Sequence, residues 1–476
     1  MFLVDESISS TSVLKLIFYY IGAGVILVPI FFRGNNMAKI LPTDGSAEKK
    51  VTISASCFMG LAHLLYLKDY IKGVFFALTE IIFLIFSPAI VKKIIGLITL
   101  GTPQPNLPIK QRDNSVFMLI DGILILALVA IFVVVYVLSV RSAKSVYREY
   151  CRKKTFYSQS VLMNKTLGSS FPIFGLAPSF IILVVFVVVP LLFSICVAFT
   201  NYSYPGHLPP GNTIDWVGFN NFVELLGSDN NWTAGFARVA TWTVIWGISA
   251  TFTCYFSGLI VAVLLKEIHV KIAPIFRFIF ILPYAVPGVV SLMVWKNLLN
   301  GTFGPINKGL MQLGLISEAI PWLSDGTMAQ ITCIIINMWA GFAYFMLLSM
   351  GTMTAIPQDI YEAAAIDGAT KGQIFRKITL PMVLYQTIPL IIMSLSHNIN
   401  NFGAIFFLTG GAPVNADSTT TQAGSTDLLI TWIYKLTINL QKYDYACVIA
   451  CLIFLVLAPF AIFNFVNTKA YKEGEV

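Results

Sequence analysis

Long, uninterrupted apolar runs are the feature that most limits how this chain can fold. A hydrocarbon core about 30 Å thick is crossed by a helix of roughly 20 apolar residues. Backbone groups inside it must be hydrogen-bonded within helices or within a closed barrel, because no water is available to them. Barrel strands alternate apolar and polar residues, whereas the runs in this chain are continuous. The sequence therefore predicts an all-α polytopic membrane protein.

Eight runs are long enough to be predicted as membrane spans, and two other stretches are less regular. The eight are 74–98, 115–140, 174–200, 237–265, 274–298, 328–352, 383–408 and 446–468. Residues 14–32 also have the length to span, while 53–67 are short enough to lie at the membrane interface. The predicted count is therefore eight spans, or ten if both of these stretches cross.

The charge content agrees with a chain whose main solvent is lipid. Charged residues make up 11% of the 476 residues, against about 25% in soluble domains. The net charge of +8 does not indicate a nucleic-acid partner, because Lys and Arg gather in short segments between the apolar runs. The seven cysteines form no C-x-x-C pair, so neither a metal site nor a disulfide framework is predicted.

The basic segments predict the orientation of the spans, since Lys and Arg are enriched in short cytoplasmic loops. Residues 141–165 hold seven Lys and Arg residues against the single acid Glu149, so this segment is placed in the cytoplasm. Counting spans forward from there puts 266–273, 353–382 and the C-terminal tail inside as well. The loops that fall outside are 201–236, 299–327 and 409–445.

One predicted cytoplasmic loop carries a helix–turn–helix pattern between Tyr361 and Pro381. Pro357 suits the start of a helix, and the three alanines at 363–365 favour a helix with a small surface. Gly368 permits a left-handed turn. A second, basic helix then leads to Leu380 and Pro381 at the start of the next span. The pattern predicts a rigid element across the mouth of the bundle that fits into a cleft of another protein.

This loop resembles the EAA loop of bacterial ABC importer permeases, which inserts into a groove on a separate ATPase subunit. The residues that the resemblance assigns to coupling are Glu362, Ala363, Ala364, Asp367, Gly368, Ile378, Leu380 and Pro381. It also implies a six-helix permease core at 166–476, with the coupling loop at 359–381. Residues 1–165 are then an N-terminal membrane region with two to four extra helices and a basic linker.

Within that family, residues 170–468 resemble the larger permease subunit of maltose and maltodextrin importers. The similarity rests on Ile281-Leu-Pro-Tyr-Ala-Val-Pro-Gly288, Trp339-Ala-Gly-Phe-Ala-Tyr344, Asn400-Asn-Phe402 and Leu408-Thr-Gly-Gly-Ala-Pro413. The enteric form carries a large extracellular domain between early spans, and no loop here is long enough to hold one. Docking of a binding protein is therefore expected on short loops.

Polar side chains inside two core spans are the candidates for a solute pathway. They are Ser394, His397, Asn398 and Asn401 on the span 383–408, and Asn337, Gly341 and Tyr344 on the span 328–352. Residues three or four apart share a helix face, and polar groups deep in a span usually line a cavity. Hydrogen bonds between neighbouring helices are the alternative explanation for the same amides. The resemblance implies sugar contacts at Asn398 and Asn401.

Three further expectations concern residues within the spans. Pro283 and Pro287 each remove a helix hydrogen bond, so they are expected to bend their span. Glu80 and Asp121 are expected to make contacts between helices. Trp339 is a weaker pathway candidate, because most aromatic residues in a span face lipid or other helices.

Together these features predict the permease subunit of a binding-protein-dependent oligosaccharide importer. The expected location is a bacterial plasma membrane, with the C-terminus in the cytoplasm. The partners implied by the resemblance are a second, different permease subunit, two ATPase subunits and an extracellular solute-binding protein. The chain has no G-x-x-x-x-G-K-[ST] phosphate loop, so ATP and Mg²⁺ are assigned to the ATPase subunits and no cofactor to this chain.

Other functions are weighed against this one. Import of a different neutral solute or of glycerol phosphate stays open. An ion-coupled secondary transporter is expected to place ionisable residues in its core spans, where this chain has amides. A membrane-embedded enzyme would need a constellation such as H-E-x-x-H, which the sequence lacks.

Overall fold

The computed structural model describes residues 41–154, 168, 175–227, 230–267 and 272–466. It divides into two compact units. The first contains residues up to Cys196 and His207–Asp215, and the second contains Val197–Gly206 and Trp216 onward. The stretch 14–32, the domain boundary at residue 165 and the C-terminal tail, on which predictions were made, lie outside the described residues.

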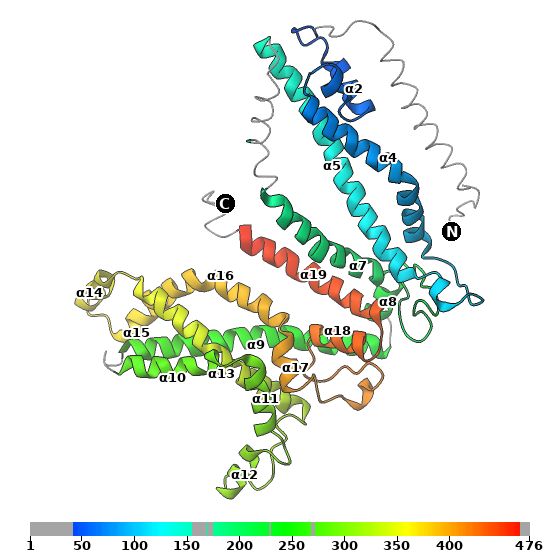
Figure 1. Ribbon diagram of the computed structural model, residues 1–476. Coiled ribbons are helices and arrows are strands. Elements are labelled where there is room, and N and C mark those ends of the chain that lie inside the picture. Colours follow the sequence, from blue (N-terminus) through cyan, green and yellow to red (C-terminus); the bar gives the residue numbers. More distant parts are fainter. Residues whose placement is uncertain (1–40, 155–167, 169–174, 228–229, 268–271, 467–476) are drawn as a thin grey trace. The chain divides into compact units, whose positions relative to one another are not determined.

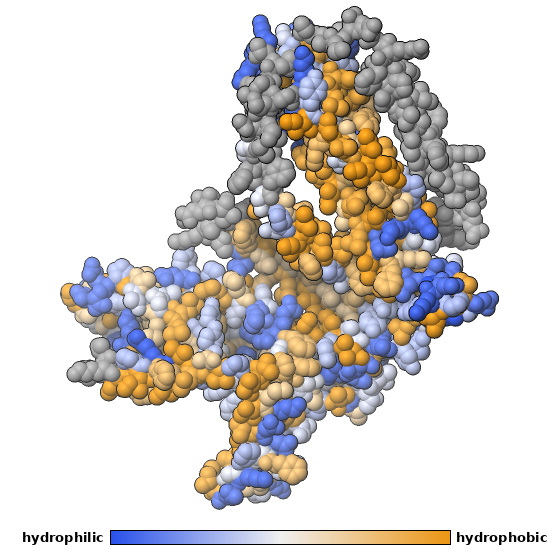
Figure 2. All heavy atoms as spheres, viewed as in Figure 1, coloured by the Kyte–Doolittle hydropathy of each residue, from blue (hydrophilic) through white to orange (hydrophobic). Residues whose placement is uncertain are grey.

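The first unit is built on a hairpin of two long helices, α4 (Tyr70–Thr99) and α5 (Ser115–Lys153), joined through the short turn η1 (Ile109–Gln111) (Figure 1). The side chains of Asp69 and Asn114 accept hydrogen bonds from backbone N–H groups in the first turns of α4 and α5, which fixes where each helix begins. Figure 2 shows hydrophobic residues over most of this hairpin. Its surface is suited to lipid.

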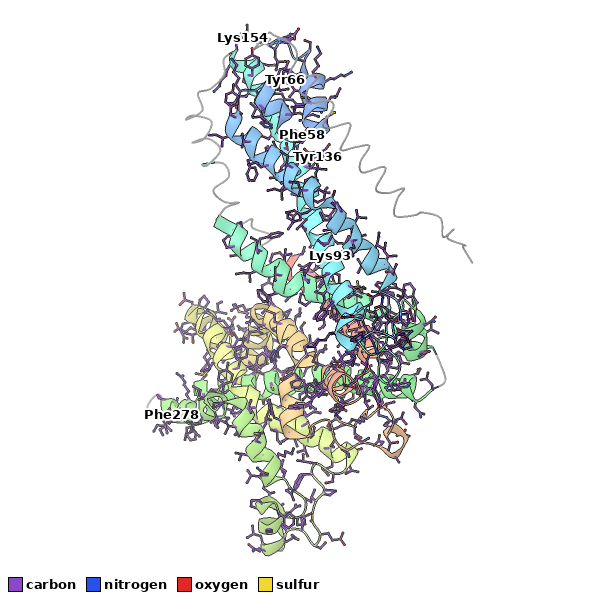
Figure 3. All side chains as sticks on the ribbon, turned by 45° about the vertical axis from the view of Figure 1, so that its right-hand side comes forward. Phe58, Tyr66, Lys93, Tyr136, Lys154 and Phe278 are labelled. Atoms are coloured by element: carbon purple, nitrogen blue, oxygen red, sulfur yellow. The ribbon has the colours of Figure 1, made fainter. Side chains whose placement is uncertain are left out.

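Two short helices, α2 (Glu48–Cys57) and α3 (Leu61–Leu65), precede the hairpin. Val51 and Ala55 of α2 are buried in one cluster with Ala143 and Tyr147 of α5. The Tyr136 hydroxyl donates to the Ser56 carbonyl at 2.7 Å, and Tyr136 and Phe58 lie close together in Figure 3. The stretch 53–67 therefore packs along α5 as parts of two short helices and does not form a span of its own.

Of the two acids predicted to make contacts between helices, Asp121 does so and Glu80 contacts the turn between α2 and α3. Asp121 of α5 forms an ion pair with Lys93 of α4, with 2.5 Å between Nζ and Oδ2, and Lys93 lies partway along the hairpin in Figure 3. Glu80 of α4 accepts a hydrogen bond from the backbone N–H of Met59, just before α3. Both contacts tie α4 to a neighbouring part of the same unit.

A long apolar helix, Gly175–Ala198, leads from the first unit into the second and contains the wide π-helical turn η2 (Val184–Val188) and α7 (Val189–Ala198). The remaining helices are α8 (Asn220–Leu226), α9 (Asn231–Glu267), α10 (Ala273–Ala285), α11 (Gly288–Leu298), α12 (Pro305–Gln312), α13 (Gly326–Thr354), α14 (Gln358–Ile366), α15 (Lys371–Ile374), η3 (Phe375–Thr379), α16 (Leu380–Ile399), α17 (Phe402–Leu408), η4 (Ala416–Ser418), α18 (Leu429–Ile438) and α19 (Tyr443–Val466). The described residues contain isolated β-bridges but no strand.

The number of spans agrees with the eight predicted from the apolar runs. Seven helices of the described residues are long and apolar enough to cross a membrane, and the pair α10 and α11 makes an eighth. Six of the eight begin at or after Gly175 and two precede it. Within the described residues, this arrangement is a six-helix core preceded by two helices, the lower end of the predicted two to four.

The pair α10 and α11 is bent by 89° at the two residues between them. Pro287 is the cap residue of α11, and Pro283 lies in the last turn of α10. Because proline lacks the N–H that a continuous helix needs, the backbone breaks here, as the sequence predicts. Figure 1 shows α11 turning away from the direction of α10.

The predicted span 383–408 is wrong in one respect, because it is two helices and not one. Helix α16 ends at Ile399, and Asn401 begins α17 as its N-cap by accepting a hydrogen bond from the Ala404 N–H at 3.2 Å. An asparagine at this position competes with helix continuation by bonding the backbone locally. The helix face assumed for Ser394, His397 and Asn401 therefore does not run unbroken through Asn401.

Helices α9 and α13 pack along each other in the second unit. A Cβ at Gly258 would lie 2.5 Å from the Phe342 carbonyl oxygen and 2.7 Å from the Met346 nitrogen, and a Cβ at Gly341 would lie 2.8 Å from Cys254 Sγ. Small residues let two membrane helices approach at the level of their backbones. The α9–α13 pair is thus the close-packed centre of this unit.

Candidate functional site: a cavity in the helix bundle and an exposed loop

The second unit encloses a cavity of about 410 Å³ at the bend between α10 and α11. Helices α9, α13 and α17 complete its wall, and none of its lining residues carries a charge. The lining residues are Trp246, Pro283, Tyr284, Val286, Gly288, Val289, Ser291, Leu292, Cys333, Asn337, Trp339, Ala340, Asn401, Gly403, Ala404, Phe407 and Leu408. A mostly apolar wall with a few polar groups is typical of small-molecule sites.

Two of the predicted pathway residues, Asn337 and Asn401, lie on this wall. The Asn337 amide lies 3.5 Å from Cys254 Sγ, which ties it to α9. Asn401 uses its Oδ1 to cap α17. Its Nδ2 has no hydrogen-bond partner among the described residues. Asn401 therefore offers a fixed donor to a solute in the cavity.

Aromatic rings stand beside these amides. Trp339 lines the cavity, and its ring is held edge-on to Trp295 with 5.4 Å between the centroids. Tyr284 lines the cavity from the bend, with its ring 6.4 Å from that of Tyr344. Aromatic faces bury large areas at a low cost in conformational entropy. The cavity thus combines stacking surfaces with amide groups.

The structure places Asn398 in the packing between helices. Its side chain is 6% exposed and donates to the Thr251 hydroxyl of α9 at 2.9 Å. Its carbonyl accepts a hydrogen bond from Trp246 Nε1 at 3.1 Å. The side-chain amide and the backbone carbonyl of Asn398 are therefore both hydrogen-bonded within the bundle. This matches the alternative explanation for the amides, hydrogen bonds between neighbouring helices.

The other predicted pathway residues do not line the cavity. Gly341 faces Cys254 of α9, where its lack of a side chain serves helix packing. Tyr344 is 40% exposed and lies beside Phe345 with 5.1 Å between the ring centroids. Ser394 is half-buried and His397 is exposed. The structure thus brings together Asn337 and Asn401, and not these four residues.

The sequence interpretation missed several wall residues, of which Trp246, Tyr284 and Phe407 contribute the largest side chains. Tyr284 lies within the Ile281–Gly288 motif and directly after Pro283. Irregular backbone within a membrane is tolerated where it lines a cavity. The position of Tyr284 directly after a helix-breaking proline therefore already indicated a cavity residue in the sequence.

The loop 359–381 has the predicted helix–turn–helix form. Glu362, Ala363 and Ala364 lie in α14, and Asp367 follows its last residue. Gly368 has φ +76°, and the Ala369 N–H donates back to the Ala364 carbonyl at 3.0 Å. This closure needs a residue that tolerates a left-handed backbone, which explains the glycine.

The second half of the loop runs into the membrane helix without a break. Thr370 and Gln373 cap each other at the start of α15. The following residues, including Ile378, form the wide turn η3, and Leu380 and Pro381 begin α16. A widened turn accommodates Pro381, which has no N–H and would press on the carbonyl of the preceding turn. Helix α15, η3 and α16 therefore form one continuous helical segment, which follows the turn after α14.

Residues 409–428 form a compact loop between α17 and α18. A Cβ at Gly411 would lie 1.8 Å from Asp427 Oδ1, so only glycine fits. Asp427 is fully buried and its Oδ2 accepts hydrogen bonds from Lys435 Nζ at 2.6 Å and Gly424 N–H at 2.7 Å. Burial raises the pKa of the Asp427 carboxyl, and the charge of Lys435 opposes this. Gly411 of the Leu408–Pro413 motif thus serves the packing of the loop.

A bundle of membrane helices around an uncharged cavity, with an exposed helix–turn–helix that continues into one of those helices, defines a membrane transport component. The family model described as "Binding-protein-dependent transport system inner membrane component" matches residues 255–469. The chain is 35% identical over 427 residues to the galactooligosaccharides transport system permease protein GanP of Bacillus subtilis, an alignment that covers 90% of this chain and 99% of that protein. The chain belongs to this family and is a permease subunit of an ABC importer.

A second relative agrees with this assignment, and a solved structure has a similar fold. The chain is 31% identical over 460 residues to the maltodextrin transport system permease protein MalC of Streptococcus pneumoniae, which covers 93% of this chain and all of that protein. A chain in the crystal structure of a bacterial alginate ABC transporter, in complex with a pentasaccharide-bound periplasmic protein, has a similar fold. Its TM-score is 0.52 at 20% sequence identity, over 65% of this chain and 98% of that one.

Proposed function

We propose that this chain forms half of the translocation pathway for a neutral oligosaccharide, delivered by an extracellular binding protein. The observation that carries the proposal is the uncharged cavity, in which Asn337 and Asn401 stand beside Trp339 and Tyr284. Rings that stack on sugar faces and amides that bond hydroxyl groups suit a polyhydroxylated ligand. Glycerol phosphate fits less well, because no cation lies on the described wall to bind its phosphate.

The names of the related proteins support the same substrate class. They include permeases of galactooligosaccharide and maltodextrin transport systems. The two names differ in the sugar, and the wall residues of this chain do not favour one linkage over the other. The proposal is therefore a neutral di- or oligosaccharide.

The loop 359–381 is proposed to couple this chain to an ATPase subunit. Glu362 and Ala363 of α14, and Asp367 directly after it, are exposed, as a docking element requires. Since η3 joins the loop to α16 without a break, rotation of α14 would move the helix that ends beside Asn401. ATP and Mg²⁺ would bind two ATPase subunits, and a second, different permease would supply the other half of the pathway. This chain is proposed to bind no cofactor.

The test is ATP hydrolysis by the purified complex in nanodiscs, with its binding protein, across a panel of sugars. Maltodextrins, galactooligosaccharides and acidic alginate oligosaccharides would be compared at equal concentration. Stimulation by one neutral class is the expected result and would name the substrate. Stimulation by the acidic sugars alone, or by none of them, would overturn the assignment to neutral oligosaccharides.

Variants at Asn401 and Asn398 separate the cavity wall from helix packing. Asn401→Asp keeps the oxygen that caps α17 and removes the amide donor. Loss of one hydrogen bond to a solute is worth about 1 kcal/mol, so sugar-stimulated uptake is expected to fall roughly five- to tenfold with the melting temperature unchanged. Asn398→Leu leaves the Thr251 hydroxyl without its partner and is expected to lower stability by about 1–3 kcal/mol. Equal loss of stability in both variants would contradict the role given to Asn401.

A further inference from the structure

A second cavity, of about 400 Å³, lies where the ends of α9 and α13 meet α14. It shares no lining residue with the cavity described above. Part of its wall is apolar, with Ala262, Met350, Met353 and Ile356, and part is polar, with Lys266, Arg277, Gln358 and Tyr361. Figure 2 shows hydrophilic residues gathered around α14 and hydrophobic residues along α10. The cavity therefore lies where a water-facing end of the bundle meets its lipid-facing surface.

Two cations on this wall have no acidic partner within the part of the chain that the structure describes. Lys266 Nζ lies 4.0 Å from the centroid of the Tyr361 ring, and neither Lys266 nor Arg277 forms an ion pair there. Elsewhere in the same unit Arg238 and Lys435 each hold a carboxylate, at 2.5 and 2.6 Å. The cavity thus keeps two positive charges available to a ligand.

Arg277 lies near the start of α10, on the same cavity wall as Lys266. It follows the first residue of α10 by four positions, about 6 Å along the helix. Its neighbours Phe276 and Phe278 are exposed apolar side chains, and Figure 3 shows Phe278 at the outer edge of α10. Arg277 is itself exposed and lies about one turn from the end of α10, where a long basic side chain can reach the membrane interface. Its guanidinium is therefore accessible to a ligand at that interface.

We propose that Lys266 and Arg277 bind a phosphate group in this cavity, carried by the head group of an anionic phospholipid. A guanidinium matches two phosphate oxygens, and an ammonium adds a point charge. Basic pockets between membrane helices on the cytoplasmic side bind anionic head groups in other proteins. The apolar part of the wall would hold the glycerol end of the lipid. The same two cations would accept free phosphate, so the test includes both sources.

The bound phosphate would also hold α14 in place. Gln358 and Tyr361 belong to α14, and the Tyr361 hydroxyl accepts a hydrogen bond from Thr379 of η3 at 3.4 Å. A lipid in this cavity therefore touches the first turn of the helix that carries Glu362. This link makes anionic lipid a stabiliser of the loop, independently of which solute the chain transports.

Native mass spectrometry of the detergent-purified complex tests the proposal. The complex is loaded with equal amounts of phosphatidylglycerol and phosphatidylcholine and then washed. Retention of phosphatidylglycerol over phosphatidylcholine is expected to fall roughly fivefold for each charge removed, in Lys266→Gln and Arg277→Gln. Arg277→Lys keeps a charge and should keep most of the preference, which separates loss of binding from loss of folding. Lys308→Gln, on the exposed face of α12, is the control and should behave as the unmodified chain.

Free inorganic phosphate is the second arm, measured by equilibrium dialysis with radiolabelled phosphate on the same variants. Lipid preference without phosphate binding supports the head-group site as stated. Phosphate binding that depends on Lys266 and Arg277, without lipid preference, keeps the phosphate site but overturns its lipid source. If the Gln variants retain phosphatidylglycerol and phosphate as the unmodified chain does, the proposal is wrong.

Discussion

At the scale of single residues, the glycine at 258 shows how the core of the second unit is specified. Its missing side chain leaves room for the backbone of α13, since a Cβ would lie 2.5 Å from the Phe342 carbonyl oxygen. Backbone atoms cannot move aside as a flexible side chain can. Gly258→Ala is therefore expected to destabilise the unit by about 1–3 kcal/mol, the usual cost of overpacking.

Gly351 supplies the matched control for this change, because it also lies within α13 and a Cβ there would meet nothing within 4 Å. Gly351→Ala is expected to leave stability unchanged or to raise it by about 0.4–1 kcal/mol. Thermal unfolding of both variants, followed by tryptophan fluorescence in detergent, checks the pair. Equal melting temperatures would contradict the close approach of α9 and α13.

At the scale of elements, the turn at Gly368 decides whether the loop 359–381 keeps its form. Its φ of +76° is strained for any residue with a side chain and most of all for a β-branched one. Gly368→Val is expected to cost about 1–2 kcal/mol locally, which loosens docking of the ATPase and lowers uptake. The Val variant should still insert in the membrane, because the turn lies outside the spans.

Gly372→Ala is the control for this turn, since Gly372 lies in α15 and a Cβ there meets nothing within 4 Å. Co-purification of ATPase subunits and sugar uptake would be measured for both variants. Normal coupling in Gly368→Val would refute the proposed role of the loop. Loss in both variants would mean that the turn geometry is not the cause.

The short helix α3 is predicted to give the first unit a pH dependence. His63 is fully buried between α3 and α5, with its Nε2 3.1 Å from the Ser142 hydroxyl and its Nδ1 without a partner among the described residues. Burial lowers the pKa of His63 to about 4, against an opposing effect of Asp69. Because the unfolded state takes up the proton first, stability is expected to fall as pH decreases from about 6.5 towards 4. The loss over that window is about 3 kcal/mol.

Hydrogen exchange of the amides in α2 and α3, corrected for intrinsic rates, measures this loss of stability between pH 4.5 and 7.5. His63→Leu removes the titrating group and should make protection independent of pH in this range. His207→Gln, at a half-buried histidine of the same unit that bonds the Thr213 carbonyl, should leave the dependence intact. A pH dependence that persists in His63→Leu would assign the effect to another group.

The elements that depend on local sequence were predicted well. Eight spans follow from apolar length, the bend in α10–α11 from Pro283 and Pro287, and the left-handed turn from Gly368. The side-chain environments were not predictable in the same way, because they depend on which helix lies opposite. Asn398 and Asn401 are three residues apart and alike in chemistry, yet one bonds α9 and the other caps α17 beside the cavity.

At the scale of the whole molecule, α9 separates two surfaces that must lie on opposite sides of the membrane. Near its start Arg238 pairs with Asp417 of the loop 409–428, and near its end Lys266 stacks on Tyr361 of α14. Twenty-eight residues of helix span about 42 Å, which exceeds a hydrocarbon core of about 30 Å. The loop 409–428 and the loop 359–381 are therefore predicted to face different compartments.

The basic end of α5 predicts which of these two loops faces the cytoplasm. Labelling of cysteines from outside the cell checks this prediction. The start of α2 lies at the cation-rich end of α5, where Glu48 pairs with Arg148, so the positive-inside rule places it in the cytoplasm. An impermeant maleimide should not label a cysteine introduced there as Lys49→Cys, at an exposed position, in intact spheroplasts but should do so after permeabilisation. A cysteine introduced as Ser317→Cys, in the exposed loop before α13, should be labelled from outside. The reverse pattern would invert the orientation and put α14 out of reach of any cytoplasmic ATPase, so this single labelling experiment decides whether the coupling proposal can hold.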